Sequence, residues 1–109
     1  MYAYEIPGLR FSLPAGGAVA MHRFVSANEN SEGIQATADT AIIGVSMNET
    51  KIGQVLEIAD GLVIVEAGGA VTAGTTVVAD ADGKAVAGDG LAIAITDATA
   101  AGDLITVKL

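Results

Sequence analysis

Glycine divides this chain into short pieces, and no other feature of the sequence limits the possible folds as strongly. Fourteen glycines separate segments that are rich in valine, isoleucine and threonine. The segments are roughly five to eight residues long, which is the length and composition of β-strands. No long window keeps an apolar stripe at helical spacing. The sequence therefore predicts an all-β fold, a small antiparallel β-barrel or β-sandwich of about 8–10 short strands.

The length and the first residues predict the domain organisation. A chain of 109 residues has material for one hydrophobic core and hence one domain. Two of its four aromatic residues, Tyr2 and Tyr4, come before a Pro7-Gly8 pair that favours a turn. We expect an extended N-terminal arm at residues 1–8, followed by a single β domain at residues 9–109.

Alternating apolar and polar residues predict individual strands. Leu9, Phe11 and Leu13 would share one face of a first strand at 9–13. A second strand is expected at 18–25, before an exposed polar loop at 26–33. Further apolar runs lie at 40–47, 54–58, 62–67, 75–79, 84–87, 91–95 and 104–109.

Two of these runs, 62–65 and 91–95, are apolar at every position. In an antiparallel sheet this predicts burial on both faces, either inside the domain or under another subunit. In the last run, Ile105, Val107 and Leu109 would face away from Thr106 and Lys108.

Two Asp-Gly pairs predict hairpins. Asp60-Gly61 lies between 54–58 and 62–66, and Asp82-Gly83 follows the run at 75–79. An Asp-Gly pair between apolar runs favours a type I′ turn, which needs positive φ at both central residues. The phrases at 53–61 and 74–83 resemble each other, but they differ in length and share little else. We interpret them as a common hairpin pattern and not as a duplication.

The charge excludes several classes of partner. The net charge is −8, and the five basic residues are scattered along the chain: Arg10, Arg23, Lys51, Lys84 and Lys108. Binding to a nucleic-acid backbone needs clustered lysine and arginine, so we expect no nucleic-acid partner. For the same reason we expect no membrane partner, since anionic membrane surfaces also attract clustered lysine and arginine. No apolar run approaches the ~20 residues of a spanning helix.

Few residues offer catalytic or metal-binding chemistry. The chain has no cysteine and one histidine, His22, which we expect in an ordinary place on the second strand. Asp80 and Asp82 resemble the start of a calcium loop. However, Ala85 and Leu91 stand where such a loop needs glycine and a bidentate acid. We expect a tight turn there, with metal binding at Asp80 and Asp82 left open, and neither a cofactor nor an enzymatic activity.

Lys84 provides an alternative function. It lies at the tip of the predicted second hairpin, where lipoyl and biotinyl carrier domains present their modified lysine. Those domains are also small, acidic and all-β. However, this chain has Gly83 where they have an acid or a methionine, and its arm and acidic loop have no place in that scheme. A tail-associated adhesion domain is a further alternative.

Several phrases occur in an order that resembles the capsid decoration, or cement, proteins of tailed bacteriophages. They are FSLPAGGAV at 11–19, RFVS at 23–26, GVSMNET at 44–50, VEAGGAVTAGTTVVADADGKAVA at 65–87 and AAGDLITVKL at 100–109. The resemblance implies a structural virion protein that binds the outer face of the capsid shell and stabilises it. It also implies the major capsid protein as partner, self-association with a trimer favoured, and synthesis in the host cytoplasm.

Such proteins have no catalytic residues, so the contact site must be predicted from physical arguments. Tyrosine supplies a large contact area at low entropic cost, and an extended segment can add to a neighbouring sheet edge. We therefore expect Tyr2, Tyr4, Ile6 and Pro7 to bind the partner. The same segment could instead pack on its own domain.

Overall fold

The chain folds into one curled, antiparallel sheet. The computed structural model describes residues 3, 5–38 and 40–109, and this part contains no helix. Its nine strands form one sheet in the order β3-β2-β4-β5-β9-β8-β6-β7, with β1 paired to β5. They are β1 (Ile6–Pro14), β2 (Phe24–Ala27), β3 (Gly33–Gln35), β4 (Gly44–Ser46), β5 (Val55–Glu66), β6 (Thr76–Ala79), β7 (Ala85–Ala87), β8 (Ala92–Ala94) and β9 (Leu104–Lys108). The all-β prediction is confirmed.

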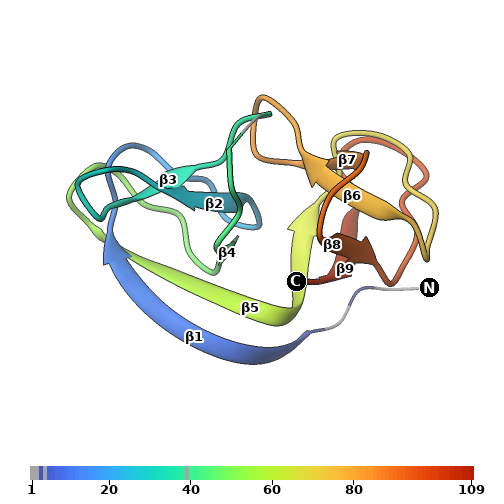
Figure 1. The fold of residues 1–109 in the computed structure, drawn as a ribbon, viewed down its shortest axis with the longest axis horizontal. Helices are drawn as coiled ribbons and strands as arrows, with labels where there is room; N and C mark the ends of the chain where they lie inside the picture. Colours follow the sequence, from blue (N-terminus) through green and yellow to red (C-terminus); the bar gives the residue numbers. More distant parts are fainter. Residues whose placement is uncertain (1–2, 4, 39) are drawn as a thin grey trace.

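The two longest strands, β1 and β5, run side by side along the base of the molecule (Figure 1). The short strands β2–β4 rise from one end of this ribbon, and β6–β9 rise from the other. On its second edge, β5 pairs with β4 through Ala59 and with β9 through Leu62 to Glu66. The ribbon therefore links two groups of strands into one sheet.

The predicted hairpin of 54–58 with 62–66 is wrong, because Asp60 and Gly61 lie within the continuous strand β5. Gly61 has φ +93°, and the register between β1 and β5 shifts opposite this site, between Pro7 and Arg10. The Asp60 carboxylate accepts a hydrogen bond of 2.9 Å from the Leu9 amide. Both halves of β5 already have partner strands, so the positive φ at Gly61 serves a bulge and not a turn.

The second predicted hairpin is confirmed: β6 pairs with β7 across the turn at 80–83. The Asp80 side chain accepts hydrogen bonds from the amides of Asp82 (2.8 Å) and Lys84 (3.0 Å). Gly83 takes a positive φ of 74°. Asp80 thus stabilises the turn through its own backbone, as aspartate commonly does.

The chain consists of two structural repeats, residues 10–59 and 62–108. The first has the order β3-β2-β4-β5-β1 and uses the first half of β5; the second has the order β7-β6-β8-β9-β5 and uses the second half. The segment Ala-Gly-Gly-Ala-Val occurs at 15–19 and again at 67–71, 52 residues later. The two valines make the same pair of backbone hydrogen bonds, Val19 with Thr50 and Val71 with Ala98.

The alignment of the two repeats differs from the one suggested by the similar phrases at 53–61 and 74–83. Gly53, the start of one phrase, is equivalent to Gly102, since both have positive φ and donate to the carbonyls of the equivalent residues Ala15 and Ala67. The phrases at 53–61 and 74–83 are therefore not the repeated units. Comparing PAGGAV with EAGGAV would have found the repeat.

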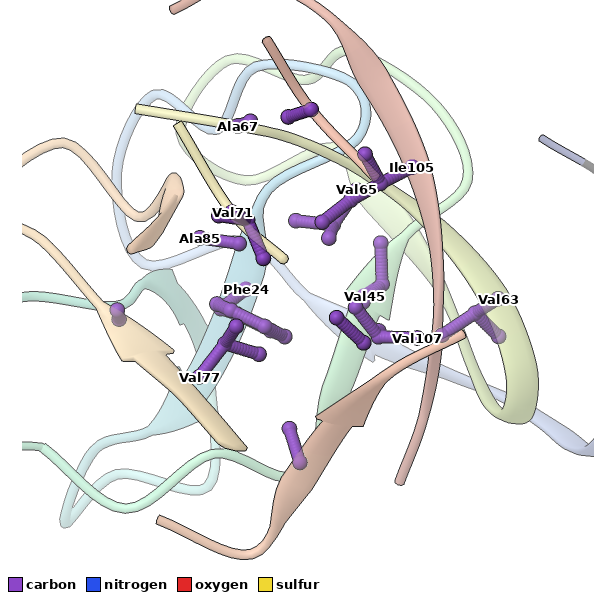
Figure 2. Close-up of a cluster of buried hydrophobic side chains, with 14 of the residues drawn as sticks. Phe24, Val45, Val63, Val65, Ala67, Val71, Val77, Ala85, Ile105 and Val107 are labelled. Carbon is purple, nitrogen blue, oxygen red and sulfur yellow. The ribbon is translucent and has the colours of Figure 1, made fainter. Parts of the chain in front are cut away.

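The first repeat packs into the open side of the second. Phe24, Val45 and Ala59 of the first repeat are fully buried in the larger core cluster, with side chains such as Val77, Ala85 and Val107 of the second. Figure 2 shows Phe24 beside Val71, Val77 and Ala85. A smaller cluster inside the first repeat consists of Ala15, Val19, Val25, Leu56 and Ile58.

Burial departs from the sequence prediction at several strands. In the run 91–95, Leu91 is 98% exposed and Ile93 is 40% exposed, so this run is not buried on both faces. In the run 62–65, Val63 and Val65 are buried while Leu62 and Ile64 are only partly so. Thr106 is buried like Ile105 and Val107, although it was predicted on the opposite face. In β8, the side chains of Ala92 and Ala94 are buried on one face, whereas Ile93 lies on the other face, which is exposed.

The polar loop predicted at 26–33 is shorter in the structure. Ser26 and Ala27 belong to β2 and Gly33 belongs to β3, so the polar loop is limited to residues 28–32. Asn28 organises it by accepting hydrogen bonds from the amides of Asn30 and Glu32. In the run 9–13, Phe11 and Leu13 pack on the smaller cluster, but Leu9 is exposed because it lies at the register shift.

Candidate functional site

His22 does not lie on a strand. It precedes β2 with φ +60° in a turn, contrary to the prediction of a strand at 18–25. Its amide donates to the Ser46 carbonyl (3.1 Å), and its carbonyl accepts from the Glu66 amide (2.9 Å). These two contacts tie the turn to β4 and β5, so the backbone of His22 has a structural role.

The described residues contain no group of three or more histidine, aspartate or glutamate side chains arranged to hold a metal. One Asp80 carboxylate oxygen already accepts two backbone hydrogen bonds inside its own turn. Among the same residues there is no helix long and apolar enough to cross a membrane. The surface of the described part of the chain is considered next as a possible binding site.

Lys84 is held in an ion pair. Its Nζ lies 3.1 Å from Oε2 of Glu66, whose Oε1 lies 3.3 Å from Nη2 of Arg23. Arg23 also donates to the Asp82 carbonyl (3.4 Å). Arg23 belongs to the first repeat and the other three residues to the second, so this cluster closes the junction between the repeats. A carrier lysine must project freely, and Lys84 does not, so the carrier alternative is not favoured.

The junction cluster changes the acidity of Glu66. Partial burial of the carboxyl by itself raises its pKa. Hydrogen bonds from Lys84 and Arg23, with the charges of both cations, outweigh this effect and lower the pKa below its ordinary value of 4.5. Glu66 is therefore charged at neutral pH and holds the two cations in place.

The exposed large apolar side chains include members of two groups on or near the sheet, besides others such as Leu9, Met21 and Leu104. At the far end of β1 and β5, Ile52 is 73% exposed, and Val55 lies directly opposite Pro14 on the neighbouring strand. Across the second repeat, Ile6, Leu62, Lys108, Ile93 and Thr76 are successive cross-strand partners on five strands. This second group is called the outer row below.

A groove of about 420 Å³ lies against β6 and β8, and no residue of the outer row lines it. Its lining includes Ala38, residues 40–42, and parts of β6 and β8, together with Leu91 and Leu109. Ile42 and Leu109 pack on the larger core cluster, whereas Leu91 is almost wholly exposed. The second repeat therefore exposes large apolar side chains, such as Leu91 and Ile93, that do not pack in its own core.

Two of the four predicted contact residues, Ile6 and Pro7, lie at the start of β1. Ile6 is 65% exposed and pairs with Leu62, and the backbone of Pro7 pairs with Gly61. Tyr2 and Tyr4 lie outside the described residues. The division into an arm at 1–8 and a domain at 9–109 stays a prediction, and β1 begins at Ile6. Leu91 and Ile93 were not among the predicted contact residues, because the apolar run 91–95 was expected to be buried inside the domain or under another subunit.

Comparison with a solved structure shows the same fold elsewhere. The chain superposes with a TM-score of 0.74 on the N base of head fiber gp8.5 in bacteriophage phi29. The two are 20% identical, and the match covers 91% of this chain and 91% of that one. At this identity the likeness shows a shared fold. No curated protein sequence matches the chain.

Comparison with protein families gives a match over nearly the whole described sequence. Residues 6–109 match the family described as phage cement protein. The match includes every strand from β1 to β9 and both repeats. The chain therefore belongs to the phage cement protein family.

Proposed function

We propose that this protein is a capsid decoration protein, which binds the outer surface of a phage capsid shell and stabilises it. The observation that carries the proposal is the family match over residues 6–109. The all-β fold shared with a phi29 head fiber base supports it. On this proposal the protein is structural and not an enzyme, and it acts on the virion after synthesis in the host cytoplasm.

The partner in this proposal is the major capsid protein, together with further copies of this chain, with a trimer favoured. The net charge of −8 supports the exclusion of nucleic acid and anionic membranes as partners. The contact on the shell would come from Tyr2, Tyr4, Ile6 and Pro7. Its support is the 65% exposure of Ile6 at the start of β1 and the suitability of tyrosine for binding hot spots.

Sedimentation with purified shells tests the proposal. The protein is mixed with expanded, mature shells that lack it and with immature shells, and each mixture is pelleted. We expect the protein to pellet with mature shells only. On this proposal its binding site is formed by several capsid subunits together and exists only after the shell has expanded. Bound shells should also survive heating better than bare ones. Equal binding to both forms, or binding to neither, would contradict the proposal, and binding to tails would support the adhesion alternative.

Variants test the contact residues. Replacing both tyrosines, Tyr2→Ala with Tyr4→Ala, should weaken shell binding at least about tenfold, since truncating a hot-spot side chain commonly costs more than ~1.4 kcal/mol. Ile52→Ala, at an exposed apolar site outside the segment, is the matched control and should bind normally. Equal binding by both variants would show that the two tyrosines do not contribute to the contact with the shell.

A further inference from the structure

A pocket in the first repeat gathers polar residues that are far apart in the sequence. Its volume is about 440 Å³. Besides residues 18–20, it is lined by Arg23 before β2, Gln35 in β3, and Glu49, Thr50 and Lys51 between β4 and β5. Ile6 does not line it, so the pocket is separate from the contact proposed at the start of β1.

The pocket reverses the charge balance of the chain. The chain has 13 acidic and five basic residues, whereas the pocket has two basic residues, Arg23 and Lys51, and one acidic residue, Glu49. Lys51 takes part in none of the ion pairs formed among the described residues. Because opposite charges attract, this part of an otherwise acidic surface favours a negatively charged ligand.

The side chains of the pocket offer hydrogen-bond donors. Gln35 Oε1 accepts a hydrogen bond from the Ala20 amide (3.0 Å), which leaves the NH₂ group of this side chain as a donor. Arg23 uses its two Nη atoms on Glu66 and on the Asp82 carbonyl, whereas its buried Nε has no partner among the described residues. These groups suit a ligand that accepts hydrogen bonds.

The Thr50 hydroxyl also lacks a partner. Thr50 is 3% exposed, and its Oγ1 makes no hydrogen bond among the described residues. Its backbone pairs with Val19 as the backbone of Ala98 pairs with Val71 in the second repeat. Alanine therefore satisfies the same place in the fold, without the free-energy cost of an unpaired buried hydroxyl. The fold does not explain this hydroxyl, whereas a ligand that accepted its hydrogen bond would.

The second repeat lacks the other polar residues as well. By strand pairing, the residue equivalent to Gln35 is Ala87. By backbone hydrogen bonds, the residue equivalent to Arg23 is Thr75. Arg23 also closes the junction between the repeats, but Gln35 and Thr50 stand where the same fold accepts alanine. The polar lining therefore belongs to the first repeat and is not needed to arrange the strands.

We propose that this pocket binds a carboxylate group, carried by an aspartate or glutamate side chain of a partner protein or by a small organic acid. Its oxygens would accept hydrogen bonds from Arg23, Gln35, Thr50 and Lys51. Two cations opposed by Glu49 leave one positive charge, which a carboxylate neutralises, whereas a phosphate would bring more negative charge against Glu49. The volume leaves room for the carbon chain that carries the group. The site goes beyond capsid binding and can be tested without a shell.

Nuclear magnetic resonance of the nitrogen-15-labelled protein at neutral pH tests the site. The probes are the blocked tripeptide acetyl-Gly-Glu-Gly-amide, its glutamine counterpart and sodium acetate. The glutamate peptide should shift the amide signals of Gln35, Thr50 and Lys51 saturably. The glutamine peptide should bind at least about tenfold more weakly, because it lacks the charge. Acetate binding as tight as that of the glutamate peptide would identify a small acid as the ligand, and weaker acetate binding a protein side chain.

The same titrations can overturn the proposal. Equal affinity for the two peptides would show that the carboxylate is not recognised. Tighter binding of inorganic phosphate than of acetate would show that the site prefers another anion. Shifts that do not saturate, or that lie away from these three residues, would show that the pocket is not a binding site.

A Thr50→Ala variant separates binding from stability. It should weaken binding of the glutamate peptide about three- to tenfold, as expected for one hydrogen bond, without lowering the midpoint of urea unfolding. Ser26→Ala is the matched control, because Ser26 also has a buried hydroxyl without a partner among the described residues and does not line the pocket. It should bind the peptide normally. A lower midpoint for Thr50→Ala with unchanged binding would assign the hydroxyl to the fold and overturn the proposal.

A pair of lysine variants separates the pocket from the net charge. Lys51→Met and Lys108→Met each remove one positive charge from an exposed residue, and Lys108 does not line the pocket. Lys51→Met should weaken binding of the glutamate peptide at least about tenfold, because a charged hydrogen-bond donor is lost. Lys108→Met should leave it nearly unchanged. Equal weakening by both would mean that overall charge attracts the peptide, and the proposal would fail.

Discussion

Phe24 and Thr76 occupy equivalent positions in the two repeats, yet Phe24 is fully buried and Thr76 is exposed. The difference arises because the second repeat packs against the face of β2 that carries Phe24, whereas none of the described residues buries the equivalent face of β6 at Thr76. The amide of Phe24 also donates to the Gly83 carbonyl across this junction (2.8 Å). One repeat therefore supplies part of the core of the other.

This relationship predicts unequal costs for the same kind of substitution. Phe24→Ala should lower the free energy of unfolding by about 3–5 kcal/mol, because it leaves a cavity in the shared core. Thr76→Ala should change it by no more than about 1 kcal/mol, because the exposed side chain loses one hydrogen bond, from its hydroxyl to the Gly88 carbonyl (2.6 Å). Urea unfolding followed by circular dichroism measures both. Similar costs at the two positions would show that the junction is not part of the core.

The bulge in β5 depends on Gly61. A Cβ there would lie 2.5 Å from the backbone nitrogen of Gly8 and would require positive φ as well. Gly53 also has positive φ, but a Cβ there would meet nothing within 4 Å. Gly53→Ala should therefore cost about 1 kcal/mol from backbone strain, and Gly61→Ala clearly more. Equal losses in thermal or urea unfolding would mean that β1 and β5 do not approach closely at this point.

Acid should destabilise the fold through two carboxyls. Three hydrogen bonds lower the pKa of Asp103, from the Thr99 amide first, then the Thr99 hydroxyl and the Ala100 amide. The pKa of Glu66 is lowered as well. A carboxyl with a depressed pKa in the folded state binds protons more readily when unfolded. Its stabilisation is therefore complete above the ordinary pKa and is lost as the pH falls through the folded value.

The ordinary values, 4.5 for Glu66 and 3.8 for Asp103, set the pH range in which this loss begins. Unfolding free energies measured from neutral pH downward should fall below about pH 4.5. The Glu66→Gln variant should be less stable at neutral pH and should lose less on acidification. An unchanged slope in this variant would show that Glu66 does not contribute.

Lys84 should be unmodified and of modest energetic importance. The intact mass of protein from its native source should show no acyl group on this lysine, since its Nζ is engaged by Glu66. Lys84→Met keeps the length of the side chain and removes the ion pair, which is partly exposed and should contribute no more than about 1 kcal/mol. A mass increase that disappears in this variant would revive the carrier interpretation.

Local sequence patterns predicted the strand content but not all of the connections. The hairpin at 80–83 was predictable because Asp80 and Gly83 satisfy the turn within a few residues. The same reasoning failed at Asp60-Gly61. There, long-range pairing of β5 with β1, β4 and β9 outweighs the local preference for a turn. His22 left its predicted strand for a similar reason, since its backbone bonds to residues 46 and 66.

The site was harder to predict than the fold. The run 91–95 was predicted to be buried on both faces or covered by another subunit, and the structure shows Leu91 and Ile93 exposed. Apolar composition reports that a side chain avoids water, but it does not distinguish a core from an interface. The repeated Ala-Gly-Gly-Ala-Val segment at 15–19 and 67–71 was visible in the sequence. Only the pairing of the strands showed which face of each repeat is covered.

Cryo-electron microscopy of the phage particle tests the proposed function most directly. Particles with the protein and particles depleted of it should be reconstructed and their difference calculated. We predict additional density on the outer surface of the shell, into which this nine-stranded fold fits. Difference density confined to the tail or to the interior, or no difference in the shell, would contradict its assignment as a capsid decoration protein.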